Sequence, residues 1–221
     1  MNIRSLYRPA SPLARALRIQ PVVFGLCALL SLNALAVSSS LQPEEIQDAY
    51  SLGQTTNHEE LAAFLNQYEH DFKYPSDNPV AFVQSVEFQT PYEQIVLRSQ
   101  RTTQYTKFQA AEDYQANPGL VIVRVVASLK TGYSGPAPAA DSFNVVVSQT
   151  KSIKPRKVAS AVLCNPYNWN DNPVGTNCVA YTREILLQFD ASQFRPGKAT
   201  VTVAPPEGRS LETKYDLDKL K

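Results

Sequence analysis

The spacing of the hydrophobic residues changes along the chain, and the first regular period is helical. Pro43 followed by two acids suits the first turn of a helix, because proline needs no amide partner there and acids face the positive end of the dipole. Gly53 can end this helix, and Asn57 with Glu60 three residues later has the pattern of a second helix cap. The apolar stripes of the two helices are Ile46, Ala49 and Tyr50, then Leu61, Phe64, Leu65 and Tyr68. We expect a hairpin of two short helices packed on the core.

A long helix is predicted over residues 92–115, between Pro91 and the stop signal Asn117-Pro118-Gly119. Its stripe, at spacings of three and four, consists of Tyr92, Ile95, Val96, Ser99, Thr103, Thr106, Ala110 and Tyr114. The middle of the stripe is small or hydroxylated, so a neighbouring element can approach closely. We expect this helix to pack on a sheet, because a membrane-binding or partner-binding helix needs bulkier and more continuous apolar residues.

Strands are predicted on both sides of this helix. Alternation from Val80 predicts a strand with Val80, Phe82, Val86 and Phe88 on one face. Residues 120–129 are apolar on both faces apart from Arg124 and Ser128, which is typical of a central strand. Further strands are predicted over 143–147, 158–163, 179–189, 199–203 and 211–217, and residues 205–208 form a strong turn signal. The pattern predicts an α+β fold in which the N-terminal helices and one long helix pack on a mostly antiparallel β-sandwich.

The last strands also resemble part of a known architecture. The run Ile-Leu-Leu-Gln-Phe-Asp at 185–190, followed by Pro196, Gly197 and the last two strands, resembles the closing strands of immunoglobulin-like domains. The resemblance covers about 35 residues and is architectural. It implies an immunoglobulin-like sandwich and no particular activity, because many functions share that architecture.

The N-terminus has the three parts of a secretory signal. A basic stretch ends at Arg18, an apolar run extends from Val22 to Leu35, and small residues at Ala34 and Ala36 suit signal peptidase. The apolar run is shorter than the ~20 residues that span a bilayer, so we expect a cleavable signal over 1–36 rather than a retained anchor. Residues 37–221 then form a single α+β domain with a sandwich-like C-terminal part.

The charge balance argues against a nucleic-acid-binding protein. The chain has 21 Lys and Arg against 20 Asp and Glu, and residues 1–36 hold four arginines and no acid. The remaining residues therefore carry 21 − 4 = 17 basic and 20 acidic groups, a net charge of −3. A mildly acidic domain has no broad basic face for phosphates.

Only Cys164 and Cys178 remain after signal cleavage. A pair of cysteines in an oxidising compartment favours a disulfide, and this one would close a loop of about 15 residues and stabilise the fold by roughly 3 kcal/mol. A redox or nucleophilic thiol is the alternative. Such a thiol needs a close second cysteine or a histidine, and neither stands beside these two in the sequence.

The segment between the two cysteines is the candidate ligand-binding loop. It holds the only tryptophan of the chain, and the candidate contacts are Tyr167, Trp169, Asn170 and Asp171. Flat aromatic rings beside amide groups can stack on and hydrogen-bond sugars or peptides. The alternative is a long turn whose Asn and Pro residues serve local geometry. A calcium loop is disfavoured, because only Asp171 is charged and no bidentate Glu follows at the required distance.

The sequence offers little catalytic chemistry. Its two histidines, His58 and His70, fall in the predicted second helix, too far apart to share a metal ion. No metal-ligand motif, phosphate-binding loop or serine-hydrolase elbow is present, so we expect no metal and no cofactor. The carboxylate pairs Glu112/Asp113 and Asp216/Asp218 remain, and surface solvation accounts for them better than a two-carboxylate hydrolase does.

A compact basic patch surrounds Pro155, made of Lys151, Lys154, Arg156 and Lys157. It can attract anionic polymers such as envelope polysaccharide, lipid headgroups or nucleic acid. It can also protect a sheet edge from pairing with other chains, which we favour.

These observations predict an exported protein, periplasmic or extracellular and most simply bacterial, with no membrane span after signal cleavage. The predicted function is a non-catalytic envelope or extracellular interaction module whose partner is a cell-envelope protein or a carbohydrate. A carboxylate-dependent hydrolase is the alternative. A buried acid facing a deep pocket favours the hydrolase, and a shallow aromatic surface favours binding.

Overall fold

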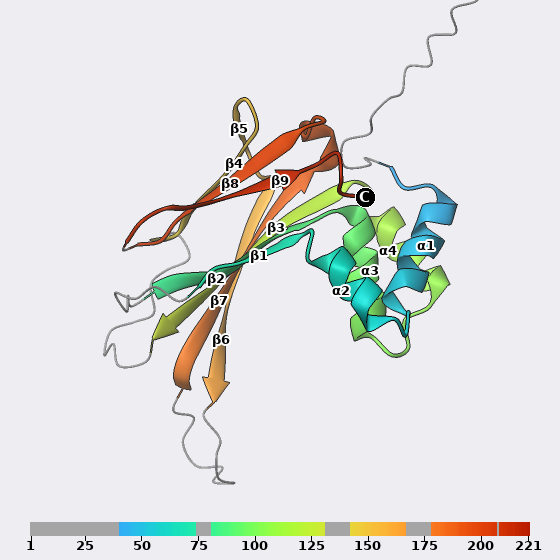
Figure 1. The fold of residues 1–221 in the computed structure, drawn as a ribbon, viewed down its shortest axis with the longest axis horizontal. Coiled ribbons are helices and arrows are strands. Elements are labelled where there is room, and N and C mark those ends of the chain that lie inside the picture. Colours follow the sequence, from blue (N-terminus) through green and yellow to red (C-terminus); the bar gives the residue numbers. More distant parts are fainter. Residues whose placement is uncertain (1–39, 74–80, 131–141, 167–177, 207) are drawn as a thin grey trace, which may run out of the picture. The chain divides into compact units, whose positions relative to one another are not determined.

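The computed structural model describes residues 40–73, 81–130, 142–166, 178–206 and 208–221. In these residues four α-helices lie beside two β-sheets whose strands are all paired antiparallel (Figure 1). The predicted α+β class and the mostly antiparallel two-sheet arrangement are confirmed.

The first two helices lie where the sequence predicts them. α1 spans Pro43–Gly53 and begins with its proline, and α2 spans His58–Leu65. The side-chain oxygen of Asn57 accepts a hydrogen bond from the backbone amide of Glu60 at 3.2 Å. This bond satisfies one of the amides that the first turn of a helix leaves without an internal partner.

The prediction of one long helix over residues 92–115 is wrong, because the chain forms two helices there. α3 spans Pro91–Arg101 and α4 spans Lys107–Ala116. The backbone is extended at Thr102, and Thr106 caps α4 by accepting from the amide of Gln109, whose side chain accepts in turn from the amide of Thr106. This reciprocal capping box starts a new helix although the hydrophobic spacing continues.

The predicted stripe is buried or half-buried where it lies within α3 and α4, chiefly against other helices, but Thr103 and Thr106 between the two helices are exposed. Its buried members share a cluster with residues of α1 and α2, and the members are Leu41, Ile46, Ala49, Leu61, Tyr92, Ile95, Val96, Tyr105 and Ala110. The predicted sheet is a smaller partner: the side-chain amide of Gln94 donates to the carbonyl of Leu120 at 2.7 Å. The helices therefore form a core of their own beside the sandwich.

α1 and α3 approach closely at Gly53. A Cβ atom placed there would lie 1.9 Å from Oγ of Ser99 and 2.3 Å from the carbonyl oxygen of Val96. Ser99, one of the small residues in the middle of the stripe, thus lies at a close helix contact, which only glycine permits at position 53.

The larger sheet has five strands in the order β1-β2-β3-β7-β6. Their bounds are Glu69–Asp71, Ala81–Gln89, Leu120–Lys130, Cys178–Asp190 and Lys157–Pro166, in that order across the sheet. β3 is central, as predicted, and Val121, Val123 and Val125 are fully buried. α3 and α4 connect β2 to β3, which are neighbours in the sheet.

The smaller sheet has four strands in the order β5-β4-β8-β9, with bounds Ser152–Ile153, Asn144–Ser148, Lys198–Ala204 and Leu211–Asp216. A short 3₁₀ helix, η2 at Ala191–Gln193, leads from β7 toward β8. Alternate residues of β8 share one buried cluster with those of β3 and β7, so the main core lies between the sheets. Tyr68, Leu217 and Leu220 belong to the same cluster.

One face assignment in β2 is wrong. Val86 and Phe88 are buried as predicted, but before them Ala81 and Val83 are buried while Phe82 is only half-buried. The register of β2 against β3 shifts between Val83 and Ser85, which is a β-bulge. The extra residue shifts the alternation by one position, so odd-numbered residues face the core before the bulge and even-numbered residues face it after the bulge. Val80 lies outside the described residues.

Among the helices that the structure describes, none is long and apolar enough to cross a membrane.

Candidate functional site: a basic cavity and a buried carboxyl pair

The predicted ligand contacts Tyr167, Trp169, Asn170 and Asp171 lie outside the described residues. Their loop joins the ends of β6 and β7. At those ends Cys164 is opposite Tyr181, and Pro166 is opposite Cys178, in the strand register. The side chains of the two cysteines are not among those described, so the disulfide stays a prediction.

Part of the predicted basic patch lines a cavity of about 380 Å³. The cavity lies between the β4–β5 turn and the segment that follows η2. Its described lining residues are Gln149, Thr150, Lys151, Ser152, Ile153, Lys154, Gln193 and Arg195. Three of these eight residues are cations and none is an acid, so the cavity has a positive potential suited to anions.

Hydrogen bonds from glutamine side chains hold the two walls of this cavity together. The amide nitrogen of Gln149 donates to the carbonyl of Arg195 at 2.8 Å, and its amide oxygen accepts from the backbone amide of Arg195 at 2.9 Å. From the opposite wall, Gln193 donates to the carbonyl of Lys154 at 3.2 Å. These cross-links fix the backbone that carries the cations, which lowers the cost of ordering the site on binding.

The other two members of the predicted patch lie next to the cavity. Arg156 is 3.9 Å from the carboxylate of Asp190, and both side chains are substantially exposed. Hydrogen bonds from the hydroxyl and the backbone amide of Ser192, with a smaller effect of Arg156, hold the pKa of Asp190 below its ordinary value. Asp190 is thus ionised and offsets Arg156, whereas the cavity itself keeps an excess of positive charge.

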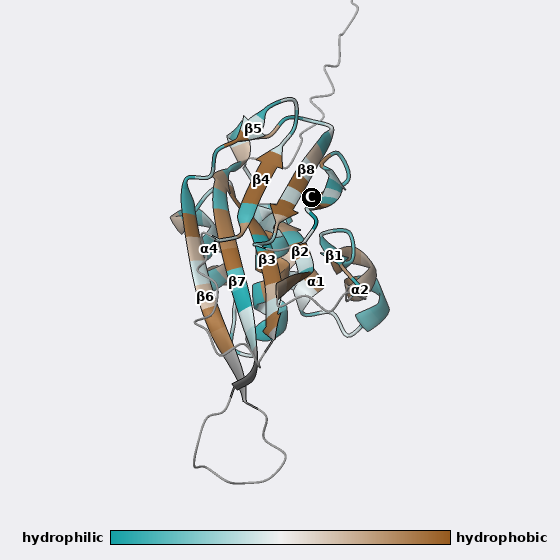
Figure 2. Ribbon diagram, turned by 90° about the vertical axis from the view of Figure 1, so that its left-hand side faces the viewer, coloured by the Kyte–Doolittle hydropathy of each residue, from teal (hydrophilic) through white to brown (hydrophobic). Residues whose placement is uncertain are grey.

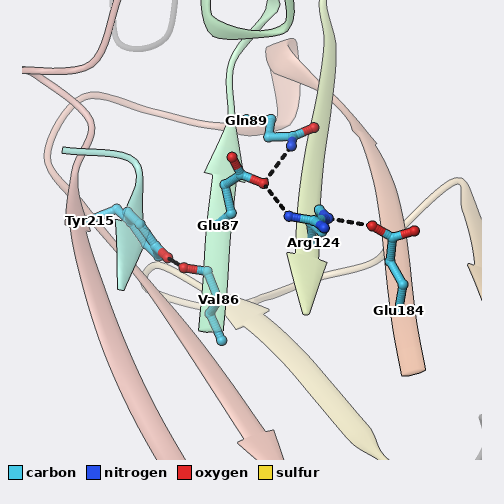
Figure 3. Close-up of polar contacts among 6 residues, drawn as sticks. All are labelled: Val86, Glu87, Gln89, Arg124, Glu184 and Tyr215. Atoms are coloured by element: carbon cyan, nitrogen blue, oxygen red, sulfur yellow. Dashed lines mark hydrogen bonds and ion pairs between the residues drawn. The ribbon is translucent and has the colours of Figure 1, made fainter. Parts of the chain in front are cut away.

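A second polar cluster lies on the face of the five-stranded sheet opposite the sandwich core (Figure 3). Glu87 of β2 accepts from the side-chain amide of Gln89 at 2.6 Å and from the guanidinium of Arg124 in β3 at 3.3 Å. Arg124 also forms a hydrogen-bonded ion pair with Glu184 of β7. One arginine thus bridges two acids across three neighbouring strands.

Glu93, in the first turn of α3, is fully buried beside Glu87. Neither of its carboxyl oxygens has a hydrogen-bond donor among the described residues. Burial, and then the charge and hydrogen-bonding of Glu87, raise the pKa of Glu93 to about 10. Glu93 is therefore protonated at neutral pH.

Two buried tyrosines lie near these acids and form separate hydrogen bonds with the backbone. The hydroxyl of Tyr215 donates to the carbonyl of Val86 at 2.6 Å (Figure 3), and the hydroxyl of Tyr68 accepts from the backbone amide of Lys221 at 3.0 Å. Burial raises the pKa of both phenols. They stay neutral and contribute hydrogen bonds rather than charge.

The two histidines do not share a helix, which corrects the sequence prediction. His70 lies in β1, and its ring packs edge-on against Tyr215 with centroids 5.0 Å apart. α2 ends at Leu65, and the carbonyl of Tyr68 then accepts from the amide of Phe88, so the chain has already joined the sheet.

The carboxylate pairs chosen from the sequence form no common site. Asp113 accepts from Arg98 at 2.5 Å and from the hydroxyl of Tyr105 at 2.7 Å, while Glu112 is exposed. Asp216 pairs with Lys219, and Asp218 accepts from the backbone amide of Gly197. Each of these acids serves a local contact or faces solvent, as the surface reading predicts.

Sequence reasoning missed the acids that the fold does bring together. Glu87 is flanked by apolar residues in β2, and Glu93 has the ordinary appearance of an acid in the first turn of a helix. The sequence did contain one signal for this cluster, namely an acid within a predicted strand. An acid that is buried in a strand needs a hydrogen-bonding or charged partner. Among the described residues, no group of three or more His, Cys, Asp or Glu side chains has an arrangement that could hold a metal ion.

Comparison with known proteins gives no relative from which a function could be transferred. No protein-family model matches the chain, and no curated protein has a significantly similar sequence.

Proposed function

We propose that the chain is an exported, non-catalytic interaction module of the cell envelope, and that it binds an anionic polysaccharide at the basic cavity. The observation that carries the proposal is the cavity lined by Lys151, Lys154 and Arg195 without an acid among its described lining residues. Its backbone walls are held together before any ligand arrives. An extended acidic polymer can place repeated charges over the cavity and over the adjacent Lys157.

We also propose that the sandwich is immunoglobulin-like. In that architecture one sheet has the strand order ABED and the other CFG, with C′ added beside C in some members. The orders β2-β3-β7-β6 and β5-β4-β8-β9 agree with this pattern if β2 is strand A and the remaining strands follow in sequence order. The assignment supports a scaffold role and by itself implies no ligand.

A carboxylate hydrolase is the second candidate, because the protonated Glu93 lies beside Glu87, which accepts a hydrogen bond from Arg124. Such a pair is the usual pattern for a general base and a general acid. Against it, Glu87 is 4% exposed and Glu93 is 0% exposed, so a substrate reaches neither group without an opening of the sheet and helix contact. Burial therefore favours the binding module.

Retention on immobilised dextran sulfate, with neutral dextran as the matched matrix, tests the binding proposal. We expect retention on the sulfated polymer only, and a steep loss as salt is raised. Lys151→Gln and Arg195→Gln should each weaken binding by about fivefold, while Lys107→Gln on α4 should leave it unchanged. Trp169→Ala in the same series tests whether the cysteine-flanked loop also contacts the polymer.

Unchanged retention in both cavity variants would contradict the cavity as the binding site. Equal binding to duplex DNA at matched charge would contradict a polysaccharide ligand. Turnover of a glycan that Glu93→Gln abolishes would instead favour the hydrolase.

A further inference from the structure

We infer that strand β6 pairs with β6 of a second copy of this chain, giving a symmetric dimer with one continuous sheet. The inference is independent of the proposed function, because it rests on the edges of the sheets and not on the basic cavity.

Three of the four outer strands in the two sheets are short or charged. β1 has three residues, Glu-His-Asp, all exposed. β5 has two residues and lies between Lys151 and Lys154. β9 carries Glu212 and Lys214, which pair with each other at 3.2 Å. Short or charged strands of this kind protect a sheet edge from pairing with another chain.

Strand β6 is neither short nor charged along most of its length. It has ten residues, and none of those from Val158 to Asn165 is charged. Its exposed side chains include Val158 at 57%, Val162 at 44% and Leu163 at 56%. Among the described strands only β7 is paired with it, so one side of its backbone has no strand partner (Figure 2). Long, uncharged and apolar edges are templates for strand pairing.

Two of these exposed residues, Val158 and Val162, also continue the face of the sheet that forms the sandwich core, whereas Leu163 points to the opposite face. Val158 is opposite Leu187 and Ser160 is opposite Ile185 in the β6–β7 register, so these pairs share one face. Leu187 and Ile185 are 3% and 2% exposed because the sandwich covers them. At β6 that cover ends, and an additional strand would extend the same apolar face.

A second copy fits this edge better than a foreign strand does. Pairing of two β6 strands closes both open edges at once, as a two-fold interface requires, and leaves the short acidic β1 at each outer end of the combined sheet. A foreign strand would present a new edge of its own.

The charges of β6 also permit this pairing. In an antiparallel pair centred on Ala161, Lys157 of one copy is opposite Asn165 of the other. The two Lys157 residues are then eight positions apart, about 26 Å at 3.3 Å per residue. This is well beyond the screening length of about 8 Å, so the basic ends of the two strands do not repel each other appreciably.

Sedimentation equilibrium of the purified protein from about 1 µM to about 200 µM tests the inference. We expect a monomer–dimer equilibrium that changes little between about 0.1 M and about 1 M salt, because backbone and apolar contacts are not screened. Val162→Lys should weaken dimerisation at least tenfold, since the two introduced charges would lie diagonally next to each other on one face of the paired strands. Phe108→Lys, at a 71% exposed residue of α4, is the matched control and should dimerise like the parent protein.

Both substitutions are at exposed positions, and circular dichroism with a thermal melt verifies that each variant is folded. A monomer throughout the concentration range would overturn the inference, and so would a dimer that Val162→Lys leaves intact. Open-ended oligomers would overturn the two-fold arrangement.

Discussion

Glu93 connects the stability of the fold to pH. An ordinary glutamate has a pKa near 4.5, whereas burial and Glu87 raise the pKa of Glu93 to about 10 in the fold. Because the pKa of Glu93 is higher in the folded than in the unfolded protein, the fold is most stable below the unfolded pKa, where Glu93 is protonated in both states. Its stability then decreases as the pH rises from the unfolded toward the folded pKa. Each pH unit within this window costs about 1.4 kcal/mol, so the cost at pH 7 is about 3 kcal/mol.

Glu93→Gln should therefore stabilise the protein at pH 8 by a few kcal/mol and change its stability little at pH 4. Glutamine has nearly the shape of a protonated glutamate and needs no proton to be buried. Urea unfolding at the two pH values measures the difference, with the exposed Glu112→Gln as control. An equal gain at both pH values would contradict the assignment of a protonated Glu93.

At the scale of single elements, agreement between prediction and structure depends on how local the determinants are. α1, α2 and β3 were predicted because their caps, breakers and apolar periods lie within each segment. The helix break at Thr102 and the bulge after Val83 escaped prediction, because the hydrophobic spacing continues across the first and the second depends on pairing with β3.

The candidate sites follow the same rule. Lys151 and Lys154 are visible as a cluster in the sequence, but Arg195 reaches them only through the fold, some forty residues later. Glu87 and Glu93 are close in sequence, yet a strand end and a helix start separate them, and no periodicity indicates that their side chains converge.

The contact between α1 and α3 provides a test at this scale. Gly53→Ala should destabilise the fold by about 2 kcal/mol, because the added methyl group meets Ser99 and the backbone of Val96 and the two helices must separate. Thermal or denaturant unfolding measures the loss, and Gln47→Ala on the exposed face of α1 is the control. A gain in stability, as expected for alanine in an unobstructed helix, would mean that the helices are not in close contact there.

At the scale of the whole molecule, the mass of the exported protein tests two predictions together. Signal cleavage after Ala36 gives a mature N-terminus at Val37, and retention of residues 1–36 would contradict it. A disulfide between Cys164 and Cys178 lowers the mass by about two hydrogens and blocks alkylation until the protein is reduced. In the described register Cys178 lies three residues from the partner of Cys164, so the bond would draw the end of the β6–β7 hairpin together.

The two cores also differ in when the chain can complete them. Buried members of the helical cluster all come from residues 41–110, whereas the sandwich core includes Tyr68 and Leu220. A chain that emerges N-terminus first, from the ribosome or through a membrane, can assemble the helical cluster while its last strands are still inside. The sandwich then closes only after emergence, when the final residues pack beside β2. The helices are thus available as an early, local folding unit that brings together the ends of β2 and β3 before their long-range partners arrive.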